Sequence, residues 1–222
     1  MLEVTVEKQI GDLNMKADFV VERPVITALI GKSGAGKTTL ANMLAGLVKP
    51  DRGRIVFNGT VFFDGAAGAE LPPEKRGVGY VFQEHRLFPH LSVRRNLTFG
   101  RWLGGRKNGE KLPKIVELLG LGQLLDRRPD TLSGGESRRV AIGRDLSACE
   151  SFLIMDEPLS SLAVALKEDI MNYIAMIPEN FSFPMIYITH DMGEVERLAE
   201  EALVIEGGRL TGSCPARELS AR

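Results

Sequence analysis

The stretch that decides the fold is Val25-Ile26-Thr27-Ala28-Leu29-Ile30-Gly31-Lys32-Ser33-Gly34-Ala35-Gly36-Lys37-Thr38-Thr39. Residues 25–30 are apolar or β-branched without a break, which predicts a strand buried on both faces. Residues 31–38 match the pattern G-x-x-x-x-G-K-[ST]. After them, apolar residues recur at the spacing of one helix face, at Leu40, Met43, Leu44 and Leu47. The sequence therefore predicts a strand, a glycine-rich turn and a helix in direct succession.

This succession is typical of a phosphate-binding loop. Its glycines let backbone amides face phosphate oxygens without an intervening Cβ, and the helix N-terminus favours an anion. Lys37 supplies a positive charge for the β- and γ-phosphates, Thr38 a hydroxyl for Mg²⁺, and Thr39 a hydrogen bond to the α-phosphate. The expected phosphate-binding residues are Gly31, Lys32, Ser33, Gly34, Ala35, Gly36, Lys37, Thr38 and Thr39. An ordinary strand-to-helix turn is the alternative interpretation.

A second signal is the apolar run Phe152-Leu153-Ile154-Met155, which ends in the two acids Asp156 and Glu157. A buried strand delivers such carboxylates to the carboxyl edge of a sheet, where ligands bind in open α/β folds. We expect Asp156 to reach Mg²⁺ through its water shell and Glu157 to act as a general base toward water. Alone, the run would be taken for a solvated strand end; beside a phosphate-binding loop it indicates a catalytic site.

Three further features stand at the ends of predicted elements. Ser133 can cap a helix whose bare Gly134 and Gly135 amides offer a second phosphate-contacting surface, although the segment Leu132–Glu136 could be a plain helix start. Its distance along the chain from the loop suits a site shared by two chains. Gln83 and His190 each follow a predicted strand, where they could reach a metal or water and the γ-phosphate. A surface glutamine and a structural histidine are the alternatives.

Composition excludes several classes of protein. The chain has 222 residues, 44% of them hydrophobic, and a formal net charge of -1, which fits one packed domain and argues against a nucleic-acid-binding protein. Cys149 and Cys214 lack metal-ligand spacing and fit packing in a reducing cytoplasm. The N-terminus is not a secretory signal, and no apolar run approaches the roughly 20 residues that span a bilayer. Work at a membrane would therefore require docking to another chain.

The remaining patterns predict one α/β domain with an insertion. Hairpins are expected around Gly11-Asp12, Asn58-Gly59 and Gly207-Gly208. Helical patterns dominate from residue 84 to 147, at 93–99, 111–119 and 136–146, and strands return at 151–155 and 185–189. Residues 1–83 and 148–222 would then form the nucleotide domain and residues 84–147 an inserted helical subdomain.

Taken in order, these motifs resemble those of the ATP-binding-cassette (ABC) ATPases, and the resemblance covers residues 1–222 as a single domain. It implies a P-loop NTPase core, a RecA-like mixed sheet with an antiparallel β subdomain, that binds ATP and Mg²⁺. It implies a head-to-tail homodimer in which one subunit completes the ATP site of the other. The implied residues are Glu157, His190 and Gln83 for catalysis, Thr38, Gln83 and Asp156 for Mg²⁺, and Ser133, Gly134, Gly135 and Glu136 for ATP held by the partner.

Within that family, residues 71–83 and 86–97 are similar to the importer type. Gly79-Tyr80-Val81-Phe82-Gln83 and Arg86-Leu87-Phe88-Pro89-His90 are most similar to molybdate importer ATPases, although sulfate, ferric-iron, thiamine and sugar importers share much of this stretch. The resemblance implies that residues 84–99 receive a membrane permease and that a substrate-binding protein acts indirectly. It also implies a peripheral location at the cytoplasmic face of the inner membrane, without a nucleic-acid partner.

Several features depart from the family. Ser160-Ser161-Leu162-Ala163 ends in alanine where the family has an aspartate that couples the two sites. Asp145 stands where a small residue is usual. No tyrosine is placed to stack on adenine, and Phe19 is only the nearest aromatic residue. Many such ATPases carry a C-terminal regulatory domain, and we expect none here, since the sequence ends at Arg222.

Two other classes of function stay open. A soluble cassette ATPase acting on nucleic acid or in translation would commonly carry a second cassette or a long coiled-coil insert, and neither is found in this sequence. A nucleotide-dependent regulatory module with little hydrolysis is favoured by Ala163 and opposed by Glu157.

Overall fold

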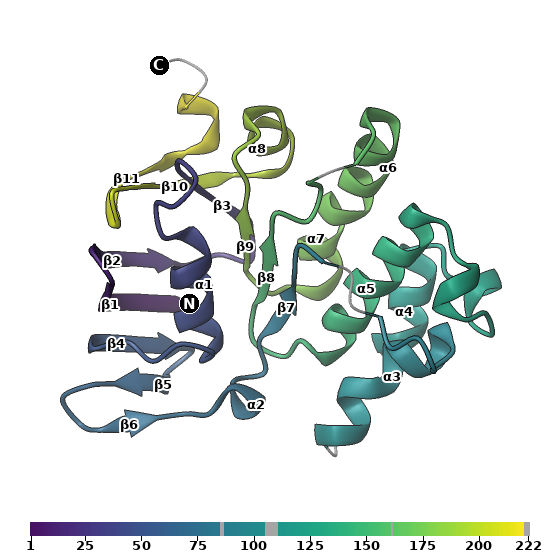
Figure 1. The fold of residues 1–222 in the computed structure, drawn as a ribbon, viewed down its shortest axis with the longest axis horizontal. Helices are drawn as coiled ribbons and strands as arrows, with labels where there is room; N and C mark the ends of the chain where they lie inside the picture. Colours follow the sequence, from purple (N-terminus) through teal and green to yellow (C-terminus); the bar gives the residue numbers. More distant parts are fainter. Residues whose placement is uncertain (85–86, 105–110, 161, 220–222) are drawn as a thin grey trace.

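The computed structural model describes residues 1–84, 87–104, 111–160 and 162–219. In these residues one eleven-stranded sheet runs in the order β6-β5-β4-β1-β2-β11-β10-β3-β9-β8-β7 (Figure 1). The strands are β1 (Leu2–Ile10), β2 (Leu13–Val21), β3 (Ile26–Ile30), β4 (Arg52–Phe57), β5 (Thr60–Asp64), β6 (Ala69–Glu70), β7 (Gly79–Val81), β8 (Leu153–Asp156), β9 (Met185–Ile188), β10 (Glu201–Glu206) and β11 (Arg209–Pro215). The helices are α1 (Lys37–Ala45), α2 (Pro73–Arg76), α3 (Val93–Gly104), α4 (Lys111–Leu118), α5 (Gly134–Ala148), α6 (Val164–Ala175), α7 (Ile177–Phe181) and α8 (Met192–Leu198).

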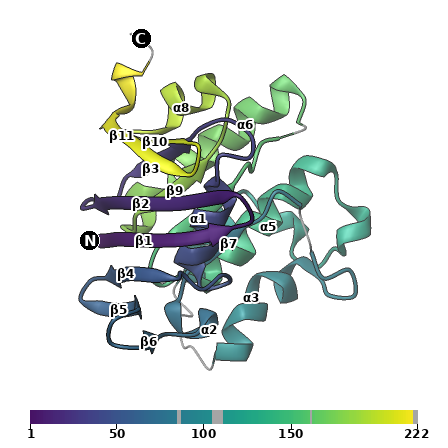
Figure 2. The same ribbon diagram turned by 60° about the vertical axis from the view of Figure 1, so that its left-hand side comes forward.

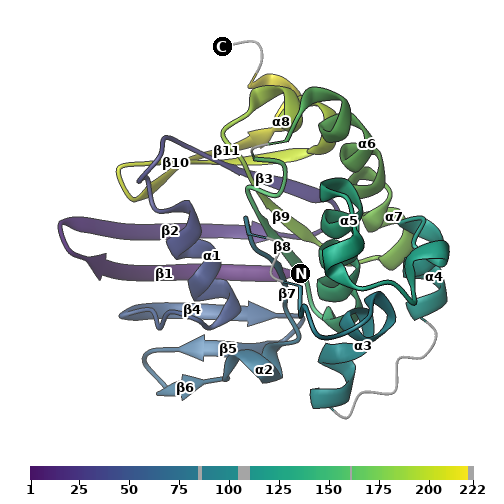
Figure 3. The same ribbon diagram turned by 45° about the vertical axis from the view of Figure 1, so that its right-hand side comes forward.

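The sheet has a parallel part and an antiparallel part. Strands β10, β3, β9, β8 and β7 pair in parallel, whereas β1, β2, β4, β5 and β6 pair antiparallel. Figure 2 shows the hairpins β1–β2, β4–β5 and β10–β11 stacked along the left side of the molecule. Helices α3 to α7 gather on the opposite side (Figures 1 and 3). The expected α/β class, with a mixed sheet and an antiparallel portion, is confirmed.

Alternation along the central strands builds two cores, one on each face of the sheet. In β8 and β9, Ile154 and Ile186 pack into a cluster with α1 and the antiparallel strands, while Leu153 and Met185 pack into a cluster with the helices α3 to α7. Each set occupies alternate positions because successive strand side chains point to opposite faces. The central strands are thereby held from both sides, and their carboxyl ends are placed firmly.

Local signals fixed most element boundaries to within a few residues. Asn58 and Gly59 adopt the positive φ values, 46° and 80°, that a two-residue hairpin turn requires. Helix α6 ends at Ala175 and α7 begins at Ile177, because Pro178 lacks an amide donor and its ring clashes with the preceding turn. The short elements β6 and α2 were not predicted. Within the described residues, no helix is both long and apolar enough to cross a membrane.

Candidate active site

The phosphate-binding loop joins the end of β3 to the start of α1. Gly36 caps α1 with a φ of 103°, a left-handed conformation that favours glycine. A Cβ at Gly36 would lie 2.1 Å from the terminal methyl of Met15, and one at Gly31 would lie 2.2 Å from the backbone oxygen of Ile205. The backbone of β10 therefore requires glycine at position 31, whereas at position 36 the flexible Met15 side chain could move and the positive φ is what favours glycine.

Lys37 lies folded over this loop and is only 7% exposed. Its Nζ donates to the carbonyl oxygens of Gly31 at 2.8 Å and Lys32 at 3.1 Å. The first amides of α1 have no acceptor within the helix, so they are available to an anion. A mobile ammonium group and these amides together can hold a chain of phosphates.

Asp156 ends β8 against the phosphate-binding loop. Its carboxylate is 8% exposed, and the Tyr80 hydroxyl donates to Oδ2 at 3.3 Å. Burial raises the pKa of Asp156, against hydrogen bonds from the Thr38 and Tyr80 hydroxyls that lower it. The hydrogen bond from Thr38 places its hydroxyl beside the Asp156 carboxylate. Two oxygen ligands of the kind that Mg²⁺ prefers therefore lie together here.

This donor set fits Mg²⁺ bound together with phosphate. Among the described residues, no group of three or more histidine, cysteine or acidic side chains is placed to hold a metal ion. Mg²⁺ in nucleotide sites commonly takes one or two protein ligands and completes its shell with water and phosphate oxygens. Thr38 and Asp156 are suited to that role and to no all-protein metal site.

Glu157 follows Asp156 at a sharp turn. Its φ is 46°, uncommon for a residue with a side chain, and its amide donates to the Ile188 carbonyl of β9 at 3.0 Å. The turn carries its carboxylate away from β8 to a position where Oε1 lies 3.3 Å from Nδ1 of His190. The ends of neighbouring parallel strands thus supply a carboxylate and an imidazole to one place.

A cavity of about 350 Å³ contains this pair. Its lining residues are Gln83, Glu157, Ser160, Lys167, Thr189, His190, Asp191 and Glu194. The structure therefore brings together all three residues that the sequence singled out as catalytic. Lys167, Thr189 and Glu194 were not predicted. The sequence around these three residues does not indicate a site, because their side chains come together only in the fold, where α6 and α8 approach β9.

The segment Leu132–Glu136 forms the start of α5. The amide of Ser133 donates to Oε2 of Glu136 at 2.8 Å, and the amide of Glu136 donates to Oγ of Ser133 at 3.3 Å. This capping box uses the Glu136 carboxylate inside the chain. A Cβ at Gly134 would face open space, whereas one at Gly135 would lie 2.5 Å from Leu166 of α6. Contact of the segment Ser133–Glu136 with a nucleotide held by a partner chain stays a prediction.

The positions that depart from the family have local consequences. Ala163 caps α6 without a side-chain hydrogen bond, and Ser161 lies outside the described residues. Phe19 is 7% exposed and packs in the core of the antiparallel strands, so its ring is not free to stack on a base. Asp145 forms a close pair with Arg144, at 2.7 Å from Nε.

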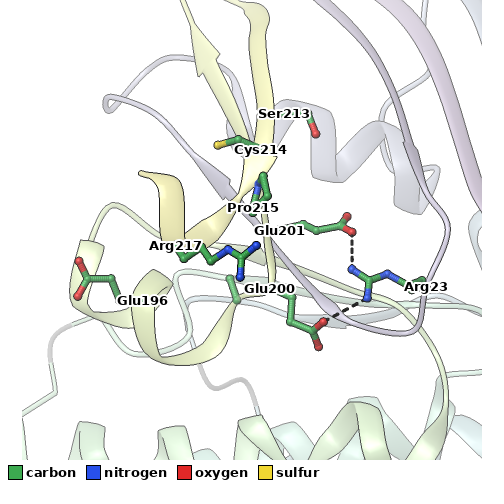
Figure 4. Close-up of a pocket in the computed structure, with 9 residues that line it drawn as sticks. Arg23, Glu196, Glu200, Glu201, Ser213, Cys214, Pro215 and Arg217 are labelled. Atoms are coloured by element: carbon green, nitrogen blue, oxygen red, sulfur yellow. Dashed lines mark hydrogen bonds and ion pairs between the residues drawn. The ribbon is translucent and has the colours of Figure 1, made fainter. Parts of the chain in front are cut away.

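A larger surface cavity, of about 860 Å³, lies elsewhere, where β10 and β11 meet Arg23 (Figure 4). Within it, Arg23 lies 3.6 Å from Glu200 and 3.0 Å from Glu201. It contains no part of the phosphate-binding loop. Size alone would therefore point to the wrong place, whereas the smaller cavity holds the reactive groups.

Comparison with known proteins adds the family. A family model described as ABC transporter matches residues 15–160, from β2 through the turn after Glu157. The chain belongs to the ABC transporter family. It is 51% identical to the molybdenum import ATP-binding protein ModC of Rhodospirillum rubrum, over 100% of this chain and 60% of that protein. It is 48% identical to ModC of Paramagnetospirillum magneticum, over 99% and 60%. The chain thus spans about 60% of the length of these relatives.

Solved structures give the same fold. The ABC family member cbiO1 of Clostridium perfringens, described as part of the transporter complex cbiONQ, matches with a TM-score of 0.85 and 26% identity, over 100% of this chain and 90% of that one. The bacterial ABC transporter cassette MJ0796 matches with a TM-score of 0.76 and 22% identity, over 98% and 99%. The latter likeness concerns the fold alone.

Proposed function

We propose that this chain is the ATP-hydrolysing subunit of an ABC importer and that the importer carries molybdate. The ATPase activity is supported by the contact of Glu157 with His190. Next to this pair, Asp156 accepts a hydrogen bond from Thr38 of the phosphate-binding loop. The substrate is supported by the ModC relatives, which are named for molybdenum import and match nearly the whole chain. The alternative within the class is an importer of sulfate, ferric iron, thiamine or a sugar.

In this proposal the loop residues 31–39 hold the phosphates of ATP, with Lys37 leaving its carbonyl partners for the β- and γ-phosphates. Thr38, Asp156 and Gln83 hold Mg²⁺, which neutralises phosphate charge. Glu157 orients the attacking water and withdraws its proton, and His190 contacts the γ-phosphate. These residues lie at the carboxyl ends of neighbouring parallel strands, or in the loop and helix start that follow β3. The groups are therefore on one edge of the sheet, where they can act together.

We further propose a head-to-tail homodimer. Ser133 and the exposed Gly134 lie at the start of α5, where the amides of Gly134 and Gly135 have no acceptor within the helix, which is suited to the phosphates of a second chain's ATP. Residues 84–147 would then act as a helical subdomain that carries this surface toward the partner. Closure on ATP and opening after hydrolysis would move the attached membrane subunits.

The permease would dock near residues 84–99, of which 85 and 86 lie outside the described residues. Asn96 is fully buried and organises this segment: its Oδ1 accepts from the Phe88 amide at 2.8 Å, and its Nδ2 donates to the carbonyls of Phe88, Leu91 and Ser92. The Phe88 ring lies 4.0 Å from that of Phe99. Such a rigid, partly apolar loop suits a peripheral subunit at the cytoplasmic face of the inner membrane, with the substrate-binding protein acting only through the permease.

The test is uptake by cells that have a molybdate permease and binding protein but lack their own ATPase. We expect the chain to restore molybdate uptake and the Glu157→Gln variant, produced at the same level, to fail. Assembly with the permease and ATP hydrolysis without molybdate uptake would exclude molybdate as the substrate. Absence of hydrolysis by the assembled complex would exclude the ATPase itself and leave a regulatory module.

A further inference from the structure

Lys167, at the end of the first turn of α6, bridges to the chain segment that follows His190. Its Nζ lies 3.1 Å from Oδ2 of Asp191 and 3.2 Å from Oε1 of Glu194. Both acids come from the start of α8, immediately after the strand end that bears His190. The lysine therefore ties helix α6 to the turn that carries the imidazole.

Glu194 is the centre of this contact. Its carboxylate is 5% exposed, and its Oε2 accepts from the Tyr187 hydroxyl at 2.9 Å and from the Thr189 hydroxyl at 2.8 Å. Lys167 reaches its other oxygen, and the buried guanidinium of Arg138 on α5 also interacts electrostatically with this carboxylate. Removing the cation of a buried ion pair strongly lowers the stability of the protein, because an uncompensated charge stays buried. Removing the cation of an exposed pair has little effect. Lys167 thus holds a charge that the interior would otherwise disfavour.

The residues on both sides of His190 are fixed by this network. Thr189 donates to Glu194 and accepts from the Asp191 amide at 3.1 Å, and Asp191 accepts from the Gly193 amide at 3.0 Å. The hydrogen bond from Lys167 is the main reason that the pKa of Asp191 is lowered. His190 itself has a side chain that is 68% exposed. Its orientation toward Glu157 therefore depends on the backbone that its neighbours hold.

The other side of the same helical turn touches the start of α5. Leu166, next to Lys167, packs so closely on Gly135 that a Cβ there would lie 2.5 Å from its Cδ1. One turn of α6 therefore contacts both the segment Ser133–Glu136 and the turn of His190. Direct contacts therefore connect Gly135, through this turn of α6, with the segment that follows His190.

We propose that Lys167 is a positioning residue for hydrolysis: through Asp191 and Glu194 it holds His190 beside Glu157 and links that placement to Gly135 by way of Leu166. This inference rests on the proposed function, since it assigns to Lys167 the placement of a group that acts on ATP. Lys167 touches neither the phosphate-binding loop nor the metal ligands in the described contacts, so it should affect turnover and not nucleotide affinity.

The first test compares Lys167→Met, Lys167→Arg and the surface control Lys49→Met, whose lysine pairs with Glu70 at 2.6 Å. We expect Lys167→Met to lower kcat at least tenfold while the Kd for ATP changes less than twofold, and we expect arginine to restore most of the rate. The control should keep the parent kcat. An unchanged kcat in Lys167→Met, or a loss that follows ATP affinity and is not restored by arginine, would overturn the proposal.

A second readout does not require hydrolysis. His190 is one of three histidines in the chain, so its imidazole resonances can be assigned by substitution. We expect these resonances to shift or broaden in Lys167→Met and to stay unchanged in Lys49→Met. Unchanged resonances would overturn the positioning role even if the ATPase were inactive.

A double-mutant cycle separates this inference from the proposed function. If Lys167 acts through His190, adding Lys167→Met to His190→Ala should lower the remaining rate by less than twofold. Additive losses would contradict action through His190. A His190→Ala variant with the parent rate would instead refute the catalytic role of His190, which belongs to the proposed function.

Discussion

The carboxylate of Glu157 and the imidazole of His190 lie 3.3 Å apart although they are 33 positions apart in the chain. They meet because β8 and β9 are neighbouring parallel strands whose register pairs Asp156 with Ile188. The positive φ of Glu157 then turns its side chain toward the end of β9. The register of two strands and one unusual backbone conformation therefore create the contact on which the proposed chemistry depends.

Replacement of Glu157 by glutamine should stop hydrolysis without loss of ATP binding. The amide keeps the shape of the side chain but cannot accept a proton, and general-base catalysis contributes roughly 10²- to 10⁴-fold. We expect kcat to fall at least 100-fold and an ATP-bound dimer to accumulate in size-exclusion chromatography. Hydrolysis at the parent rate would show that Glu157 is not the base.

Replacement of Lys37 by alanine should weaken nucleotide binding. A hydrogen bond to a charged group contributes about 1.5–3 kcal/mol, so we expect the Kd for ATP to rise roughly 10- to 100-fold. Equilibrium titration with a fluorescent ATP analogue measures the change, and Lys49→Ala serves as a surface control. An unchanged Kd in a variant with the parent melting temperature would contradict the phosphate-binding role.

An aspartate at position 163 should stabilise the chain and test the missing family residue. Ala163 has an extended backbone, with φ -64° and ψ 148°, and its carbonyl accepts from the amides of Leu166 and Lys167. This is the geometry of an N-cap, so Ala163→Asp should add about 1 kcal/mol and raise Tm by roughly 2–4 °C. Thermal unfolding monitored by circular dichroism measures it.

The Ala163→Asn variant is the matched control, because asparagine caps a helix as well as aspartate does but carries no charge. Both variants should be more stable than the parent. Turnover or cooperativity should rise only in Ala163→Asp if the carboxylate couples the two sites. Equal turnover and cooperativity in the parent and both variants would mean that an alanine at position 163 does not change the coupling between the two sites.

Asp145 should make stability fall as pH rises. Burial raises its pKa to about 6 and outweighs the hydrogen bond and charge of Arg144, which lower it. The folded chain then binds this proton more tightly than the unfolded chain, whose aspartate has a pKa near 3.8. Between about pH 4 and pH 6 the unfolding free energy should therefore drop, by up to about 3 kcal/mol at 1.36 kcal/mol per pKa unit.

Other acids titrate in the same range, so the measurement is the difference between the parent and Asp145→Asn. Urea unfolding at several pH values should show the parent losing stability relative to the variant from pH 4 to 6, with a constant difference above pH 7. Parallel curves over the whole range would show that the Arg144 pair keeps Asp145 ionised.

Local chemistry was enough to predict the phosphate-binding loop and the acids that follow β8. Glycine conformations, helix starts and apolar strands are set by neighbouring residues, so Gly36, Lys37 and Asp156 lie where their patterns indicated. The same holds for Ser133, which caps α5 as its pattern indicated, although the return hydrogen bond to Glu136 was not predicted. These features could be predicted because each depends on interactions within a few residues.

The rest of the site depended on tertiary structure. Nothing near Lys167 in the chain indicates Asp191 or Glu194. The burial of Phe19 and the low exposure of the Asp145 side chain, 12%, follow from which faces pack together. By itself, the sequence determined the phosphate-binding loop, the order of the longer strands and helices, and the acids at the end of β8. Only the tertiary structure decided that Glu157 meets His190 and that Lys167 contacts the acids that follow His190, because those distances are set by long-range packing and not by the spacing of residues in the sequence.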